Sequence, residues 1–380
     1  MRFVPFDLER WQSQWEHRVR YNLSESGVHP LTVREVLDIG SVDSEALNSI
    51  RLGYSQGNGS DKLRDIIAGM YRNCKRENII VTTGSSEANF ITCWALIEAG
   101  DQVVMMAPNY KQIWGMVENL GASVATFNLD MESSWEPSSD EIRETIQPGV
   151  KMVVVTNPNN PTGHTLSDKA RGVILERASE VGAWLLVDEV YIGAELDGNT
   201  TPSFWGSYER LLITSGLSKA YGLPGLRIGW AVGPEDLIEQ LWERHDYTVI
   251  CPSALSDFLA QVALSNRDTL LERTRGILRA NLPILESWLG QYGDSFHWRA
   301  PDAGAICYIR CPGSPDPLDL AEYLRAEHSV LIVPGTHFGN ENFIRLGYGN
   351  ETGELQSALE TLELGLRERT GWSSLAKITS

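Results

Sequence analysis

The chain has 380 residues, 42% of them hydrophobic, and is therefore long and apolar enough to bury a large core. Its formal net charge of -18 argues against nonspecific binding to nucleic acids or anionic membranes, because both depend on clustered Lys and Arg. The N-terminal residues carry charges throughout and do not resemble a secretory signal. No apolar run approaches the roughly 18 residues that span a bilayer, so we expect neither a nucleic-acid nor a membrane partner.

The cysteines and histidines indicate which redox compartment the protein occupies and whether it binds a metal. The five cysteines are odd in number, scattered and without metal-ligand spacing, which favours reduced thiols in a cytoplasm. The seven histidines include no HExxH motif and no pair at i, i+4, so we expect no metal site.

The first clear helix is predicted over residues 60–70, where Ser60 or Asp61 can act as the N-cap. From there to residue 233, Val- and Ile-rich runs alternate with amphipathic stretches, a pattern typical of a mostly parallel sheet flanked by helices. The predicted strands are residues 79–82, 103–107, 152–156, 184–189, 211–215 and 228–233.

After residue 250 the pattern changes to a long helical stretch over about 253–289 and three strand-like segments, at 303–311, 329–335 and 343–349. We therefore predict three parts. Residues 1–30 form an N-terminal segment that packs on the smaller domain and the active site, residues 31–252 a large domain, and residues 253–380 a smaller α+β domain with a long interdomain helix.

Chemically distinctive motifs follow the predicted strands of the large domain. GSSEA, PNY, NPNNPTG, DEVY and SGLSK come after the first five strands in turn. In open α/β sheets, ligands bind in the loops at the carboxyl ends of the strands. The sequence therefore predicts one site built from these five loops.

The most informative loop is residues 215–229, SGLSKAYGLPGLRIG, in which Lys219 precedes Arg227 by eight residues. A lysine amine forms a Schiff base with a carbonyl, and its pKa responds to its surroundings. Arginine keeps its charge and binds phosphate through a planar fork. This spacing is suited to an aldehyde cofactor held at one end and its phosphate at the other.

Together these motifs resemble the class I and II aminotransferases, which are fold-type I pyridoxal-phosphate enzymes, over roughly residues 20–365. The resemblance implies an α/β fold, with a mostly parallel mixed sheet flanked by helices in a large domain and a smaller α+β C-terminal domain. It implies pyridoxal 5'-phosphate as the cofactor. Lys219 matches the lysine that holds the cofactor as an internal aldimine and later moves the proton at Cα, and Arg227 matches the phosphate-binding arginine.

The resemblance assigns the catalytic set as Lys219, Asp188 and Tyr191. Asp188 matches the carboxylate beneath the pyridine nitrogen, where a neighbouring anion keeps that nitrogen protonated. The protonated ring is the electron sink that stabilises a Cα carbanion. Asn160 and Tyr191 match the residues that hydrogen-bond the phenolic oxygen of the cofactor.

Further matches concern the phosphate and the ring. Gly84, Ser85 and Ser86 open a helix whose N-terminus can receive a phosphate. Tyr110 matches the aromatic residue that stacks on the cofactor ring. Tyr54 resembles the tyrosine that reaches the phosphate in the neighbouring subunit, which implies a homodimer with sites at the interface.

One cofactor position departs from the family pattern. Gly216 stands three residues before the lysine, where the family usually has a phosphate-binding Ser or Thr. Either Ser215 or Ser218 then has to take over that contact, or the phosphate is held more weakly.

The substrate end of the site rests on two features. Arg345 matches the arginine that binds the α-carboxylate of the substrate in a bidentate manner, which favours an α-amino acid over an amino sugar. Residues 21–32, YNLSESGVHPLT, lie where family members place a mobile segment over the substrate. We therefore assign Glu25, Ser26 and Gly27 to substrate binding, and His29 is also available there.

Short segments of the chain look most like the capreomycidine-synthase-like branch, which implies an α-amino acid transformed through an external aldimine and a Cα carbanion in antibiotic-type metabolism. The alternatives are an ordinary α-amino-acid aminotransferase that yields a keto acid, and a lyase that eliminates a β-substituent or couples decarboxylation to oxidative deamination of a cysteine S-conjugate. A ligand-binding regulator on the same fold is disfavoured, because the roughly 30 residues before the core are too few and too weakly basic for a DNA-binding extension.

Overall fold

The computed structural model describes residues 3–311 and 316–370. The ends of two predicted parts, residues 1–2 and 371–380, lie outside the described residues, and the three-part division itself stays a prediction. The centre of the molecule is a seven-stranded sheet in the order β2-β8-β7-β6-β5-β3-β4. Its strands are β2 (Ile79–Thr82), β3 (Gln102–Ala107), β4 (Ser123–Asn128), β5 (Val150–Thr156), β6 (Trp184–Asp188), β7 (Leu211–Gly216) and β8 (Gly229–Val232).

The sheet is parallel except at β8, which pairs antiparallel with both β2 and β7. The predicted mostly parallel mixed sheet is thereby confirmed. The carboxyl ends of β2, β3, β5, β6 and β7 consequently share one edge, and each of these strands leads into one of the five predicted motifs. β4 was not predicted, because this edge strand has a half-exposed pattern and not a continuous apolar run.

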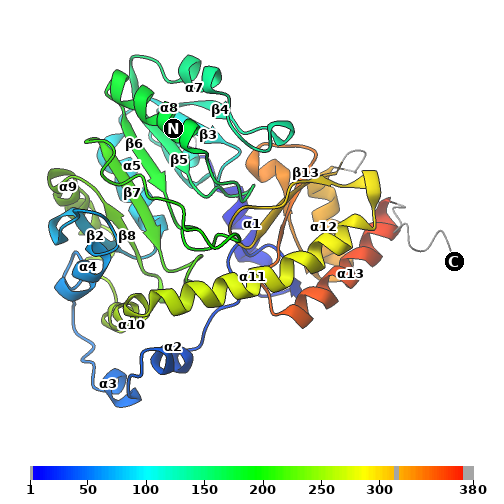
Figure 1. The fold of residues 1–380 in the computed structure, drawn as a ribbon, viewed down its shortest axis with the longest axis horizontal. Coiled ribbons are helices and arrows are strands. Elements are labelled where there is room, and N and C mark those ends of the chain that lie inside the picture. The colour runs from blue at the N-terminus through cyan, green and yellow to red at the C-terminus, as the bar shows by residue number, and fades with distance from the viewer. Residues whose placement is uncertain (1–2, 312–315, 371–380) are drawn as a thin grey trace.

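Helices cover the sheet and join its strands, as Figure 1 shows. Ser60 is the N-cap of α4, accepting a hydrogen bond from the Leu63 N–H at 3.2 Å, so of the two predicted caps Ser60 is the one used. The helices between residues 33 and 245 are α2 (Val33–Ile39), α3 (Ser44–Asn48), α4 (Asp61–Ala68), α5 (Ser85–Leu96), α6 (Gln112–Asn119), α7 (Ser139–Thr145), α8 (Asp168–Val181) and α9 (Glu235–His245).

The C-terminal part holds a second, four-stranded sheet in the order β12-β13-β10-β9. Its strands are β9 (His297–Trp298), β10 (Ile306–Arg310), β12 (Val333–Pro334) and β13 (Phe343–Gly347). Its helices are α10 (Ala254–Ser265), α11 (Arg267–Gly290), α12 (Pro317–His328) and α13 (Thr352–Thr370). The predicted long helical stretch is interrupted at Asn266, whose φ of -120° is not helical, so it forms two helices.

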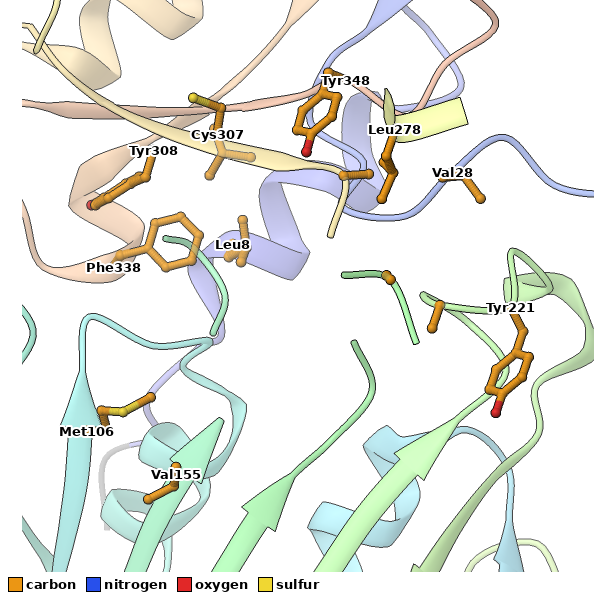
Figure 2. Packing of buried hydrophobic residues seen from close by; sticks show 14 of the residues in the cluster. Leu8, Val28, Met106, Val155, Tyr221, Leu278, Cys307, Tyr308, Phe338 and Tyr348 are labelled. Atoms are coloured by element: carbon orange, nitrogen blue, oxygen red, sulfur yellow. The ribbon is translucent and has the colours of Figure 1, made fainter. Parts of the chain in front are cut away.

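The N-terminal residues connect the two sheets. α1 (Asp7–Trp15) lies between the seven-stranded sheet and the C-terminal elements in Figure 1, and β1 (Tyr21–Asn22) pairs in parallel with β11 (Val330–Leu331). The buried Trp11 donates a hydrogen bond from its indole N–H to the Ile332 carbonyl at 2.9 Å. Figure 2 shows Leu8 of α1 beside Phe338, within one apolar cluster that also contains Met106 and Val155 of the large sheet.

Residues 3–311 and 316–370 form no helix that is both long and apolar enough to cross a membrane. They also contain no group of three or more His, Cys, Asp or Glu side chains arranged to hold a metal ion.

Candidate active site

Most of the predicted site residues meet around one cavity of about 550 Å³ at the carboxyl edge of the large sheet. The predicted residues that line it are Glu25, Ser26, Ser85, Ser86, Tyr110, Asn160, Asp188, Tyr191, Ser218, Lys219, Arg227 and Arg345. Residues more than 300 positions apart in the sequence therefore share one space, and all five strand-end motifs contribute to it, as the strand-end argument predicts.

The other predicted residues lie off the cavity wall. Gly84 is directly behind Arg227, since a Cβ built on Gly84 would lie 2.4 Å from Arg227 Nη2. A Cβ on Gly27 would lie 3.6 Å from Lys219 Cδ. Tyr54 is 88% exposed and does not reach the cavity of its own chain. His29 is also not among the cavity residues, and instead contacts Arg273 at 3.0 Å.

Lys219 stands in the loop that follows β7, and its Nζ lies 2.8 Å from Oε1 of Glu25. Burial is the largest single influence and lowers the pKa of Lys219, but the charge of Glu25, the influence of Tyr191 and the hydrogen bond to Glu25, with a smaller effect of Glu9, together outweigh it, so the net shift is upward. The charge of Lys219 is in turn the largest cause that lowers the pKa of Glu25, to about 2, against the effect of burial. The two side chains form an ion pair inside the cavity.

Asp188 ends β6, where burial raises its pKa to about 6. The Val190 N–H donates to its Oδ1 at 3.1 Å and Asn89 Nδ2 to its Oδ2 at 3.4 Å. Asn89 is itself oriented by the Thr214 hydroxyl, which donates to Asn89 Oδ1 at 2.9 Å. A buried carboxyl of this kind is stabilised as an anion by a cation beside it, and a protonated pyridine nitrogen is such a cation.

The phosphate end is formed by the N-terminus of α5 together with Arg227. Gly84, with φ +76°, turns the chain into α5 so that Ser85 and Ser86 open the helix beside the guanidinium. The free N–H groups and the dipole at a helix N-terminus bind anions. Backbone donors, hydroxyls and a cation therefore converge as a phosphate requires.

The structure explains Gly216, and it separates the two serines considered in its place. A Cβ on Gly216 would lie 3.1 Å from the Ile228 carbonyl oxygen, so β7 and β8 leave little room for a side chain. The Ser215 hydroxyl donates to the Glu189 carbonyl at 3.3 Å and is absent from the cavity wall. Ser218 does line the cavity. Of the two, Ser218 is the serine in position to contact a phosphate.

Arg345 marks the substrate end. It is 1% exposed, and its guanidinium donates to Asn160 Oδ1 at 2.8 Å and to the Ser24 carbonyl at 2.5 Å. Its Nε, like the hydroxyl of Tyr191, has no hydrogen-bond partner among the described residues. Buried polar atoms without partners are costly, and a bound carboxylate and phenolic oxygen would supply acceptors for them. The residues present therefore fit pyridoxal phosphate and an α-amino acid.

The sequence predicted that residues 1–30 pack on the active site, but it singled out none of the residues of α1 that line the cavity. Glu9 and Gln12 of α1 and Glu16 just after it line the cavity, and the Tyr110 hydroxyl donates to Glu9 Oε1 at 2.6 Å. Their spacing of three and four residues places them on one helix face. The same spacing also describes an ordinary solvated face, so the sequence alone carried no signal that would have separated the two cases. Asn89 was missed for a similar reason, since its partners are distant in sequence.

Comparison with known proteins places these features in a family. The model of the family "Aminotransferase class I and II" matches residues 25–362. Capreomycidine synthase of Streptomyces vinaceus is 31% identical over 366 residues, covering 95% of this chain and 94% of that protein.

Two solved structures share the whole fold. A PLP-dependent aminotransferase from Streptococcus suis 89-1591 has a TM-score of 0.91 and 32% identity, covering 97% of this chain and 99% of that chain. The PLP-dependent cyclase OrfR has a TM-score of 0.90 and 29% identity, covering 97% and 98%. These similarities identify a fold-type I enzyme whose cofactor is pyridoxal phosphate. The chain belongs to the aminotransferase class I and II family.

Proposed function

We propose that the protein removes the α-proton of an α-amino acid and transforms it in specialised, antibiotic-type metabolism. The observation that carries this proposal is that Lys219, Asp188 and Arg345 line one and the same cavity. A base, a carboxylate suited to a pyridinium and a carboxylate-binding arginine then face one substrate.

Each residue has a defined task in this proposal. Arg345 binds the α-carboxylate and orients the substrate, and Nζ of Lys219 takes the proton from Cα. The cofactor supplies an electron sink for the pair left on Cα. Asp188 keeps its pyridine nitrogen protonated, and Asn160 and Tyr191 bind its phenolic oxygen. Arg227, Ser85, Ser86 and Ser218 hold the phosphate.

Two outcomes are open after the proton leaves Cα. Loss of a β-substituent, followed by capture of the unsaturated product or its hydrolysis, is supported by the likeness to capreomycidine synthase and to the cyclase OrfR. Transamination to a keto acid is supported by the likeness to the Streptococcus suis aminotransferase. We favour the first outcome, because capreomycidine synthase and the cyclase OrfR both support it, each over 95% or more of the chain.

A single-turnover experiment separates these outcomes. Purified holoenzyme is mixed with a panel of amino acids and cysteine S-conjugates while cofactor absorbance and product masses are followed. Return of the original spectrum with release of ammonia, a thiol, carbon dioxide or a cyclised amino acid would support a lyase, cyclase or decarboxylating deaminase. Accumulation of pyridoxamine phosphate with a keto acid would establish transamination. Lys219→Ala should be folded and inactive, and any retained turnover would refute the role of Lys219.

We also propose a homodimer in which Tyr54 reaches the site of the partner. In support, Tyr54 is 88% exposed, and other large apolar side chains are exposed as well: Leu52, Trp94, Tyr247 and Ile250. Trp94 and Tyr247 form one aromatic pair at a centroid distance of 5.8 Å. Exposed apolar groups of this size often mark protein interfaces. The five free cysteines support the proposed cytoplasmic location.

A further inference from the structure

Glu25 is held beside Lys219 more tightly than a residue that only touches the substrate needs to be. The backbone N–H groups of Ser26 and Gly27 donate to its Oε1 at 2.8 and 2.9 Å, and Nζ of Lys219 binds the same oxygen at 2.8 Å. All three bonds converge on one oxygen, so Oε2 takes part in none of them. The carboxylate is therefore fixed against the catalytic amine with its second oxygen uncommitted to these donors.

The chain around Glu25 is fixed as well. Leu23 N–H donates to the Leu331 carbonyl at 2.8 Å, and its own carbonyl accepts from Gly347 N–H at 2.7 Å. On the other side, His29 N–H donates to the Gly349 carbonyl at 2.7 Å. These bonds tie the segment to β11, to the last residue of β13 and to the turn that follows it, close in sequence to Arg345. Glu25 thus occupies a constant place relative to both the amine and the carboxylate-binding end.

We propose that Glu25 is the general acid of the reaction: it accepts from Nζ of Lys219 the proton taken from Cα and delivers it to the group that leaves Cβ. The Cα–H bond breaks, its electron pair forms the Cα=Cβ bond, and the leaving group departs with the electrons of its bond to Cβ and this same proton. The net change is loss of HX from the substrate, with no oxidant or reductant consumed. Lys219 is left neutral, as it must be to bind the cofactor again.

The charge state of Glu25 suits this cycle. Its pKa is low chiefly because Lys219 beside it is positively charged, while burial acts in the opposite direction. Once the proton has passed from Lys219 to Glu25, this main cause disappears, so the carboxyl holds the proton more strongly than its pKa beside a charged lysine indicates. This role rests on the proposed function, because a transaminase returns the proton to the cofactor and has no leaving group to protonate.

The test compares two substrates of similar size with the wild-type holoenzyme and the isosteric variant Glu25→Gln. β-Chloro-L-alanine releases chloride, which needs no proton, whereas O-methyl-L-serine releases methoxide, which does. Pyruvate and ammonia are measured for both. General acids contribute about 10²- to 10⁴-fold, so we expect the loss caused by Glu25→Gln to be roughly 100-fold or more larger with O-methyl-L-serine than with β-chloro-L-alanine.

A second readout needs no turnover. Only the neutral amine of Lys219 attacks the aldehyde, so the rate at which apoenzyme captures pyridoxal phosphate reports its protonation. Removing the Glu25 charge should move this pH profile to lower pH and speed capture at neutral pH. The other groups that bear on Lys219 remain in both proteins: Glu9 of α1, Glu16 just after that helix, Asp188 of β6 and Tyr191 after it.

The outcomes separate this inference from the proposed function. Equal losses of Glu25→Gln on both substrates, or no loss on either, would overturn the general-acid role while leaving elimination intact. If the pH profile of pyridoxal phosphate capture is the same in the wild type and in Glu25→Gln, the proton coupling between Lys219 and Glu25 is refuted. If the wild type eliminates neither substrate and accumulates pyridoxamine phosphate, the proposed function fails and the inference fails with it.

Discussion

At the scale of single residues, the buried and ionised Asp188 lowers the stability of the cofactor-free protein, and a bound cofactor would offset this loss. Burial raises its pKa from 3.8 to about 6. Between these two values the folded chain binds the proton more tightly than the unfolded chain, so this residue makes the cofactor-free protein less stable as pH rises. Above about pH 6 the full penalty remains. A pyridinium beside Asp188 would offset it, so the same carboxyl that destabilises the apoenzyme becomes favourable in the holoenzyme.

Asp188→Asn should therefore stabilise the cofactor-free protein at pH 8 by up to about 3 kcal/mol, and by almost nothing at pH 4. Unfolding by denaturant at the two pH values measures this difference. Glu189, whose pKa burial raises to about 7, is present in both proteins, and because the charge of Asp188 is only a minor cause of that shift, most of its contribution cancels. The holoenzyme variant should lose most of its turnover. An equal stability change at both pH values would mean that ionisation of Asp188 is not the cause.

Some residues of the site could be predicted from the sequence pattern, and others are placed only by tertiary packing. Lys219 and Arg227 stand in the loop between β7 and β8, and Asp188 is the last residue of β6, so strand order and motif spacing predicted that they lie close together. Glu9 and Asn89 belong to helices, and nothing near them in the sequence indicates which surface they face. Their place depends on tertiary packing between segments about 100 residues apart, such as the bonds from Tyr110 to Glu9 and from Asn89 to Asp188.

At the scale of elements, buried strands were predictable and the exceptions have physical reasons. β4 is an edge strand in which only Phe127 is fully buried, so it lacks the apolar run that marks the inner strands. The helical stretch after residue 253 is apolar on both sides of Asn266, and its pattern does not reveal the break there. The sequence of α1 is amphipathic, but Ile332, which accepts the hydrogen bond from Trp11 of this helix, lies more than 300 positions away in the sequence.

Because α1 packs on the core and also lines the cavity, weakening its packing should lower stability and substrate affinity and leave cofactor affinity nearly unchanged. Trp11 packs into the core while Glu9 and Gln12 line the cavity, and the Trp11 indole N–H donates to the Ile332 carbonyl. Trp11→Ala should cost about 3–5 kcal/mol of stability, and Trp11→Phe, which keeps most of the packing, clearly less. We expect KM for the amino acid to rise in Trp11→Ala, because the helix carries part of the cavity wall.

Cofactor affinity should change little in Trp11→Ala, because the phosphate contacts come from α5 and the loop of Arg227. Thermal unfolding, KM and the dissociation constant of pyridoxal phosphate measure the three effects separately. Trp11→Phe serves as the matched control for packing. An unchanged KM in a folded Trp11→Ala protein would show that α1 is not part of the substrate site.

At the scale of the whole molecule, the sequence predicted the fold class and the position of the site but not how two chains would meet. The net charge of -18 opposes close approach of two copies, so an interface has to be dominated by apolar contact. The exposed side chains Leu52, Tyr54, Tyr247 and Ile250 offer such contact. Tyr54 cannot serve the cavity of its own chain from where it lies, so the proposed phosphate contact requires a partner.

This requirement gives a complementation test. Lys219→Ala and Tyr54→Ala subunits should each form poor enzymes, the first without its amine and the second with weakened phosphate binding. In a mixed dimer, one site combines Lys219 from one subunit with Tyr54 from the other and is intact, while the second site carries both defects. Statistical mixing of equal amounts makes half of the dimers mixed, so activity should return to about a quarter of the wild-type value. Mixing that restores nothing, although exchange of differently tagged subunits is demonstrated by affinity capture, would place Tyr54 outside the partner's site.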